Sequence, residues 1–156
     1  MRIGLGYDSH RLIPDRPLIL GGVTIPFGKG LDGWSDADAL THAVMDALCG
    51  ALGLGNIGVL FPPGDERFKN MSSLCLLEDV MQKVDSRGLR VVNVDAVIIA
   101  ENPRLAPYVD KMRQSIAQAL RMDASDVSVK PKSAEGMGAV GRGEGIVVHA
   151  VVLLES

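Results

Sequence analysis

The chain has 156 residues, of which 47% are hydrophobic and only 4% aromatic, so we expect one domain, residues 1–156, with an aliphatic core. The net charge of −3 argues against non-specific binding to nucleic acid, which needs a basic surface. No apolar run reaches the ~18 residues of a membrane span, and the N-terminal residues do not resemble a signal peptide. We therefore expect a cytoplasmic protein that binds neither nucleic acid nor a membrane.

The first predicted element is a short β-strand over residues 1–5, and a metal-ligand pattern follows it. Alternate residues of a strand share a face, so Asp8 and His10 would point the same way at the end of this strand. A carboxylate oxygen beside an imidazole nitrogen provides half of a divalent-metal site. In the alternative interpretation, Asp8 caps a turn and His10 is a surface residue.

Residues 11–34 predict two loops on either side of a hairpin. Prolines mark the first loop, and residues 18–26 form a hairpin in which Gly21 and Gly22 provide the positive φ of a two-residue turn. The glycine-rich segment 27–34 is expected to be a mobile loop.

A helix is predicted over residues 35–52, with Ser35 as its N-cap. Asp38, His42 and Asp46 form a polar line beside its apolar stripe. His42 could add a third metal ligand, leaving one tetrahedral position open as in catalytic zinc sites. A carboxylate one turn away could hold its second ring nitrogen. A solvated helix face is an equally good explanation of this line.

The remainder of the chain alternates helices with strands. The last strand is almost continuously apolar, so we expect both of its faces to be buried, by helices or by a partner subunit, with His149 as a structural residue. Two cysteines, Cys49 and Cys75, have no ligand or disulfide spacing and are expected to be buried free thiols. The predicted elements are helices over 72–86 and 108–122 and strands over 91–100, 126–132 and 146–154.

This order of elements predicts an α+β fold. We expect a mixed four-stranded sheet plus a small hairpin, with helices on one face and a symmetric oligomer covering the other. The segment 133–145 holds five glycines and Arg142. It could cradle a phosphate, but it lacks the Walker A pattern, and a plain flexible loop is the better interpretation of this segment alone.

Taken together, the motifs closely resemble the 2-C-methyl-D-erythritol 2,4-cyclodiphosphate synthase family of the non-mevalonate isoprenoid pathway. The resemblance covers essentially the whole chain with little sign of insertion. The matching segments include Gly6-Tyr-Asp-Ser-His10, Gly21-Gly-Val-Thr-Ile-Pro26, Ser35-Asp-Ala-Asp38 with His42, Leu60-Phe-Pro62, Ile98-Ile-Ala100 and Gly141-Arg-Gly-Glu-Gly145.

The resemblance implies a phosphorus–oxygen lyase that acts as a homotrimer, with active sites between neighbouring subunits. Its substrate would be 4-diphosphocytidyl-2-C-methyl-D-erythritol 2-phosphate, a cytidine diphosphate-linked small molecule. The 2-phosphate of this molecule would attack its own β-phosphorus, so that CMP leaves and a cyclic diphosphate forms. The alternatives are a zinc-dependent phosphatase on the same ligands and a trimeric binding protein stabilised by a structural metal.

The resemblance also implies two metal ions. Zinc would bind to Asp8, His10 and His42. Glu135 would coordinate a second divalent cation, Mg²⁺ or Mn²⁺, which bridges the α- and β-phosphates and suits oxygen ligands.

The substrate contacts implied by the resemblance fall into three groups. Residues for the phosphates, which include the catalytic candidates Trp34, Ser133 and Glu135, are Asp8, His10, Trp34, Ser35, Lys132, Ser133, Ala134, Glu135 and Arg142. Residues for the methylerythritol are Asn56, Ile57, Gly58, Phe61 and Asp65. Residues for the cytidine are Ala100, Pro103, Arg104, Leu105 and Ala106.

Some positions depart from the commonest pattern of the family. Trp34 replaces a histidine, so a donor to phosphate is either lost or replaced by the indole N–H. Asn56 replaces an aspartate and can still form a hydrogen bond to a hydroxyl group. Pro63-Gly64 replaces an Asp-Thr pair. Ala139 replaces an aromatic residue near the trimer axis, where we expect the regulatory pocket of some members to be altered or absent.

Overall fold

A computed structural model describes residues 1–156. The strands are β1 (Arg2–Pro14), β2 (Leu18–Leu20), β3 (Val23–Ile25), β4 (Lys29–Leu31), β5 (Arg90–Ile99), β6 (Val127–Lys132) and β7 (Gly145–Glu155). The helices are α1 (Ala39–Leu52), α2 (Ile57–Leu60), α3 (Ser73–Asp85), α4 (Val109–Leu120) and α5 (Gly138–Gly141), with short 3-10 turns at Glu66–Phe68, Ala106–Tyr108 and Ala124–Asp126.

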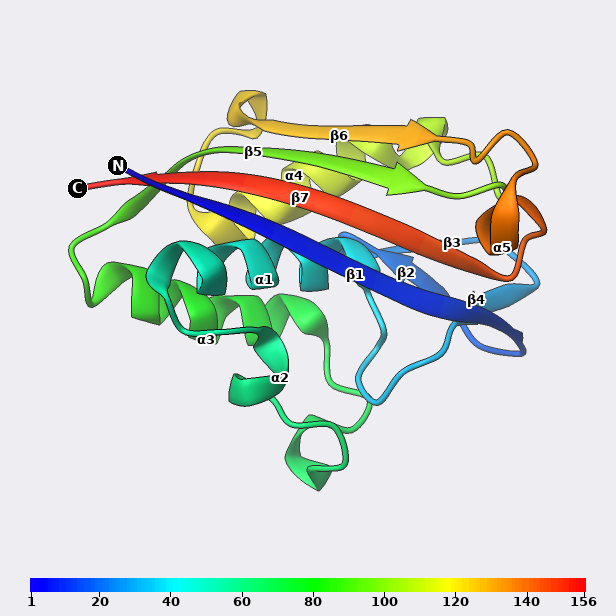
Figure 1. The fold of residues 1–156 in the computed structure, drawn as a ribbon, viewed down its shortest axis with the longest axis horizontal. Helices are drawn as coiled ribbons and strands as arrows, with labels where there is room; N and C mark the ends of the chain where they lie inside the picture. Colours follow the sequence, from blue (N-terminus) through cyan, green and yellow to red (C-terminus); the bar gives the residue numbers. More distant parts are fainter.

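Five strands form one mixed sheet in the order β4-β1-β7-β5-β6, and β2 pairs with β3 in a separate hairpin. Only β5 and β6 run parallel; the other neighbours in the sheet are antiparallel. The long helices lie on one side of this sheet, and the two termini lie side by side at one end (Figure 1). The α+β fold predicted from the sequence is confirmed. None of the helices has the length and apolar character needed to cross a membrane.

Two glycines of β1 allow α1 to pack directly against the strand. A Cβ atom on Gly4 would lie 1.8 Å from the carbonyl oxygen of Ala47, and one on Gly6 would lie 1.9 Å from that of Ala43. Any side chain at either position would push the helix away from the sheet. This close approach brings His42 of α1 beside Asp8 of β1.

The hairpin forms as predicted, with positive φ at Gly21 and Gly22. Its turn amides donate to the carboxylate of Asp38, at 2.8 Å from Gly21 and 2.7 Å from Gly22. The same fully buried carboxylate accepts from the backbone N–H of Thr41 and is the N-cap of α1. The prediction that Ser35 caps this helix is therefore wrong, because the chain becomes helical only at Ala39.

Two further expectations are corrected by long-range pairing. Residues 29–31 form β4 against the end of β1, so the segment 27–34 is not simply a mobile loop and the sheet has five strands instead of four. β1 continues to Pro14 because its pairing with β7 runs from Arg2 to Arg11 and β4 extends it. Asp8 and His10 thus lie within a strand, not at its end.

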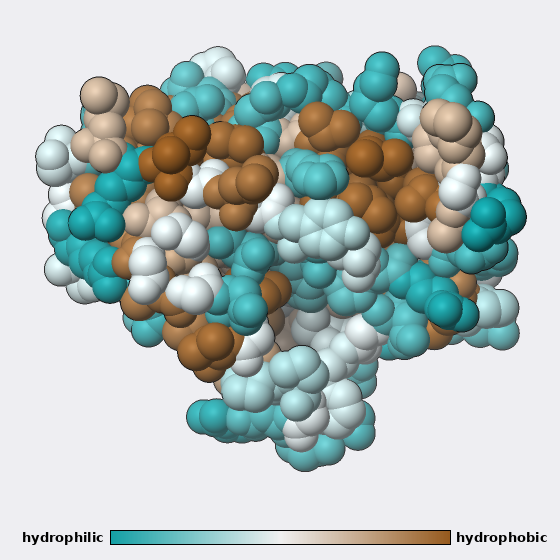
Figure 2. Space-filling model, viewed as in Figure 1, coloured by the Kyte–Doolittle hydropathy of each residue, from teal (hydrophilic) through white to brown (hydrophobic).

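The sheet has one face buried by helices and one face that the chain leaves open. A core of 38 buried hydrophobic residues lies on the helix side. β7 alternates between buried and more exposed residues, so the helices of the chain bury one of its faces. Burial of the other face by a partner subunit stays a prediction. On the open face, Ile3 is 72% exposed, Leu5 68% and Tyr7 53%. Figure 2 shows hydrophobic residues gathered over the strands on this side.

Candidate active site

Three side chains from two elements converge on one point, as the sequence predicts. Oδ2 of Asp8 lies 2.7 Å from Nε2 of His10 and 3.1 Å from Nδ1 of His42. The two ring nitrogens are 3.3 Å apart. Ligand atoms of these three residues lie within 4.8 Å of one another, so the group could hold a metal ion. One carboxylate and two imidazoles are a ligand set typical of zinc.

The far nitrogen of the His10 ring fixes which nitrogen faces this point. Nδ1 of His10 lies 2.6 Å from the carbonyl oxygen of Asp32, which can only accept a hydrogen bond. Nδ1 therefore carries the hydrogen, and in the neutral ring the lone pair of Nε2 points toward Asp8 and His42. A backbone carbonyl behind the ring is a common partner of metal-binding histidines.

The partner of His42 differs from the expectation. Neither carboxylate of the predicted polar line reaches its ring, because Asp38 caps α1 and Asp46 accepts from the backbone N–H of Ile57 at 3.1 Å. Nε2 of His42 instead lies 2.8 Å from Oγ of Ser73 and 3.2 Å from Oγ of Ser35. Sequence spacing gives no signal for Ser73, which is 31 positions from its histidine.

Charge and burial shift the pKa values of His10 and Asp8 in opposite directions. Burial alone would lower the pKa of His10, but the hydrogen bond and charge of Asp8, together with the Asp32 carbonyl, outweigh it and raise that pKa. Burial would likewise raise the pKa of Asp8, but hydrogen bonds from His10 and His42 hold it below its ordinary value. Since a metal requires neutral imidazoles, protons and metal compete for these ring nitrogens.

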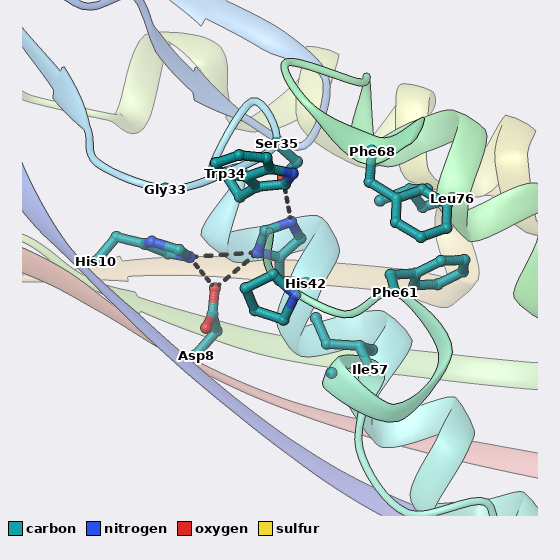
Figure 3. A pocket seen from close by; sticks show the side chains of 12 residues that line it. Asp8, His10, Gly33, Trp34, Ser35, His42, Ile57, Phe61, Phe68 and Leu76 are labelled. Atoms are coloured by element: carbon teal, nitrogen blue, oxygen red, sulfur yellow. Dashed lines mark hydrogen bonds and ion pairs between the residues drawn. The ribbon is translucent and has the colours of Figure 1, made fainter. Parts of the chain in front are cut away.

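The three ligands line one side of a cavity of about 370 Å³ that has an apolar wall (Figure 3). Of the residues expected to bind substrate, Trp34, Ser35, Ile57, Gly58 and Phe61 line it together with the metal group. Sequence reasoning missed Phe68 and Leu76, which complete the wall opposite the histidines. A single aromatic residue in a turn and one leucine of an amphipathic helix gave no sign of this position.

Trp34 has a hydrogen-bonding partner within the chain. Its indole N–H donates to the carbonyl oxygen of Asp65 at 2.8 Å, and its own carbonyl accepts from the backbone N–H of Asn70 at 2.9 Å. These bonds tie Trp34 to residues 65–70, of which Phe68 lines the cavity. The indole N–H of Trp34 is thus already bonded within the chain, and in this conformation it is not free to donate to a ligand.

Two residues expected at the methylerythritol pocket lie beside the cavity and do not line it. Asn56 precedes α2 as its N-cap residue. The carboxylate of Asp65 is held by Arg67, with Nη2 2.6 Å from Oδ2. α2 itself carries Ile57 and Gly58 into the cavity wall.

The residues expected to bind cytidine lie in a different cavity of about 310 Å³. Ala100, Pro103, Arg104, Leu105 and Ala106 all line it, and so do Lys132 and Ser133, which were expected to contact the phosphates. It shares no lining residue with the cavity at the metal group. A single chain therefore does not bring the two halves of the predicted site together.

The loop after β6 carries Ser133, Ala134 and Glu135 and is held by Glu101. The carboxylate of Glu101 accepts from the backbone N–H of Ala134 at 3.1 Å and of Gly136 at 3.2 Å. The Ser133 hydroxyl donates to Glu135 at 2.9 Å. No local pattern points to Glu101, since its two partners are more than thirty positions away in the sequence.

The last two predicted residues lie near α5. Ala139 lines a third cavity, of about 280 Å³, which His10 also reaches. The guanidinium of Arg142 is paired with Glu144, with Nε 2.6 Å from the carboxylate. Within one chain Arg142 lines neither the metal cavity nor the cytidine cavity.

An α+β fold with an acid and two imidazoles converging at a pocket defines a metal-binding enzyme class, and comparison with known proteins specifies the family. The family model described as "YgbB family" matches residues 1–155. The 2-C-methyl-D-erythritol 2,4-cyclodiphosphate synthase of Moorella thermoacetica is 56% identical over 154 residues, which cover 99% of this chain and 94% of that protein. The synthase of Gloeobacter violaceus is 57% identical, covering 99% of this chain and 95% of that protein.

Comparison with solved structures points to the same family. One described as 2C-methyl-D-erythritol-2,4-cyclodiphosphate synthase, bound form CDP, has a TM-score of 0.91 and 38% identity, covering 99% of this chain and 100% of that one. The bifunctional IspDF from Campylobacter jejuni has a TM-score of 0.94 and 39% identity; 98% of this chain corresponds to only 42% of that protein. The chain belongs to the YgbB family of 2-C-methyl-D-erythritol 2,4-cyclodiphosphate synthases, which confirms the family predicted from the sequence.

Proposed function

We propose that this protein converts 4-diphosphocytidyl-2-C-methyl-D-erythritol 2-phosphate to 2-C-methyl-D-erythritol 2,4-cyclodiphosphate and CMP. The main support is the convergence of Asp8, His10 and His42 on one side of a substrate-sized pocket. The oxygen of the 2-phosphate attacks the β-phosphorus, and the bond between that phosphorus and the CMP oxygen breaks. Since the nucleophile is already an anion, the site has to align two anions and needs no strong base.

The chain's residues fit a cation at this point. Asp8, His10 and His42 would hold zinc, because one acid oxygen and two imidazole nitrogens leave a position open for a phosphate oxygen. When bound, zinc supplies a Lewis acid that offsets the negative charge gathering between the two phosphates. Ser35 lines the cavity beside the group and is proposed to donate to a phosphate oxygen.

Glu135 is the proposed ligand of a second cation, Mg²⁺ or Mn²⁺. Its carboxylate is exposed and lies next to the Ser133 hydroxyl, while the neighbouring Glu101 carboxylate is occupied by backbone donors. One protein carboxylate with phosphate oxygens completing the shell is a common arrangement for Mg²⁺. Lys132, Ser133 and Ala134 are proposed to contact the same phosphates.

The methylerythritol is proposed to occupy the cavity at the metal group, against Ile57, Gly58 and Phe61, with Asn56 and Asp65 at its edge. The cytidine is proposed to occupy the cavity lined by residues 100–106. The solved synthase in its CDP-bound form supports a cytidine-linked ligand for this family.

We propose that the active protein is a homotrimer with each site between two subunits. Two observations support this assembly: the two cavities share no lining residue within one chain, and the open sheet face exposes apolar side chains such as Ile3 and Leu5. A neighbouring subunit would cover that face and complete the site. A cytoplasmic location belongs to this proposal as well.

The test is a reaction of the purified protein with the diphosphocytidyl substrate, followed by ³¹P NMR of the products. The expected products are CMP and a cyclic diphosphate in equal amounts. Asp8→Ala should lose turnover by at least about 10³-fold while keeping the assembly intact. Release of inorganic phosphate instead would support the phosphatase alternative, and disassembly of Asp8→Ala would make the metal structural.

A first prediction concerns the second cation. Glu135→Gln should shift the Mg²⁺ concentration for half-maximal rate upward by about tenfold, because an amide oxygen binds a hard cation more weakly than a carboxylate. The measurement is the initial rate of CMP release across a Mg²⁺ titration. An unchanged titration would remove Glu135 from this site.

A further inference from the structure

On the side away from the metal group, the ring of His42 contacts Ser73, which in turn contacts Asp36. The proposed function uses neither of these two residues. Ser73 is the first residue of α3 and is fully buried. Its hydroxyl oxygen lies 2.8 Å from Nε2 of His42 and in hydrogen-bond contact with Oδ1 of Asp36. The backbone N–H of Ser73 donates to Oδ2 of Asp36 at 2.9 Å.

Counting the available hydrogens shows which group donates in each hydrogen bond of the series His42–Ser73–Asp36. An ionised carboxylate can only accept, and a serine hydroxyl has one hydrogen, so Ser73 donates that hydrogen to Asp36. The lone pairs of the Ser73 oxygen are then left for Nε2 of His42, which must carry a hydrogen in order to donate. Ser35 Oγ, 3.2 Å from Nε2, itself accepts from the backbone N–H of Ala37 and is a weaker second partner.

We propose that Ser73 and Asp36 are positioning residues that hold the hydrogen of His42 on Nε2 and thereby keep Nδ1 free to bind a metal ion. The inference rests on the proposed metal site, since it assigns a purpose to the free Nδ1. In His10 the carbonyl oxygen of Asp32 plays the corresponding part: it holds the hydrogen on Nδ1 and leaves Nε2 free to bind a metal ion. For His42, whose helix offers no carboxylate in reach, α3 and the segment before α1 provide the acceptor.

The same contacts set the angle of the ring. Asp36 also accepts from the backbone N–H of Asp38 at 3.1 Å, so its carboxylate is fixed by two backbone groups from different segments. Ser73 is fixed in turn because α3 begins at that residue. The Asp36 carboxylate cannot turn without breaking these backbone hydrogen bonds, and the Ser73 hydroxyl between Asp36 and His42 passes this constraint on to the imidazole ring.

The test is the zinc affinity of the purified protein, measured by competition with a chromogenic chelator. Ser73→Ala removes the acceptor and should weaken zinc binding by about 10- to 100-fold, a typical loss for partners behind metal-binding histidines. Asp36→Asn should give a loss in the same range, because an amide must turn its NH₂ toward one of three donors. Ser72→Ala is the matched control: this neighbouring serine is exposed and makes no side-chain cap bond, so zinc affinity should not change.

A second readout is independent of affinity. The chain has three histidines, so ¹⁵N NMR of the zinc-loaded protein can resolve His42. The hydrogen should be on Nε2 and exchange slowly with solvent in the wild type, and quickly in whichever of the two variants folds. Thermal unfolding followed by circular dichroism identifies a misfolded variant, and the other variant then decides the result.

The outcomes separate this inference from the proposed function. Zinc affinity within about twofold of wild type in both variants would overturn the positioning role and leave the metal site standing. A hydrogen on Nδ1 of His42 in the zinc-loaded protein would overturn the positioning role and also remove Nδ1 as a metal ligand. A loss in Ser73→Ala but not in Asp36→Asn would overturn the assignment for Asp36. A wild-type protein that binds no zinc would overturn the proposed metal site itself.

Discussion

At the scale of single residues, the two cysteines differ more than the sequence suggests. Cys49 is fully buried in α1, where burial and the nearby charge of Asp46 raise the pKa of its thiol to about 11. Cys75 is exposed on α3, so the expectation that both thiols are buried is wrong for this one. It failed because the apolar residues around Cys75 in sequence belong to other faces of the helix.

This difference predicts that one thiol per chain reacts with a thiol reagent at pH 8. Cys49 is neutral at that pH, below its raised pKa, and solvent does not reach it; only a thiolate reacts. The measurement is thiol titration of the native and the denatured protein, with Cys75→Ser as the control that should show no rapid reaction. Two rapid thiols in the native wild type would contradict the burial of Cys49.

The metal ligands were predictable at this scale, but their partners were not. Asp8 and His10 were found because alternation along a strand places them on one face, and His42 was added because histidines are rare here. Ser73 and the carbonyl of Asp32 come from segments that are distant in sequence, and no local periodicity relates them to the ligands.

At the scale of elements, the contact between β1 and α1 depends on the absence of side chains. Gly6→Ala should lower the free energy of unfolding by more than about 3 kcal/mol, because its Cβ would meet a backbone oxygen that cannot move aside. Gly28→Ala is the matched control, since a Cβ there meets nothing within 4 Å. Chemical denaturation of both variants measures the difference, and equal stabilities would contradict the close approach.

The loop after β6 gives a second prediction for an element. Glu101→Ala removes the acceptor of two backbone N–H groups and should raise the KM for the diphosphocytidyl substrate about tenfold, because Ser133 and Glu135 lose their fixed position. Zinc affinity should stay unchanged. Glu78→Ala, an exposed change on α3, is the control. Steady-state CMP release gives KM, and an unchanged KM would show that the loop holds its shape without Glu101.

Local elements were predicted well where the signal was local. The hairpin at Gly21-Gly22, α3 and α4 follow from turn residues and apolar stripes that lie within each segment. β4 and the second half of β1 were missed because their strand character comes from long-range pairing: residues 6–11 pair with β7, and residues 12–14 pair with β4. The start of α1 was misplaced because Asp38 bonds the hairpin and the helix at once.

At the scale of the whole molecule, the apolar open face of the sheet predicts the assembly. The mass in solution should be three times the 16.6 kDa of one chain. Leu5→Asp should reduce it to that of a single chain, because a charge would be buried in the interface. CMP release should then fall to background while zinc still binds, since each chain keeps its own ligands. Val59→Asp, at a position of similar exposure on α2, should not change the mass in light scattering.

A Leu5→Asp protein that stays trimeric would place the interface elsewhere. The sequence predicted that a partner covers the open face of the sheet, because the last strand carries apolar residues on both of its faces. It could not give the strand order, which depends on which strands meet across the chain. That order also explains why the residues proposed to bind cytidine, which follow β5, lie apart from Asp8 and His10 on β1.

The antiparallel pairing of β1 with β7 places Arg2 opposite Leu154, so the chain begins and finishes at the same corner of the molecule (Figure 1). A short peptide could join the two termini without distorting a strand, and new termini could be placed in a surface loop. By the same geometry another domain could be fused at this corner and leave the rest of the surface uncovered. In the bifunctional Campylobacter jejuni protein, the region that matches this fold makes up 42% of the chain.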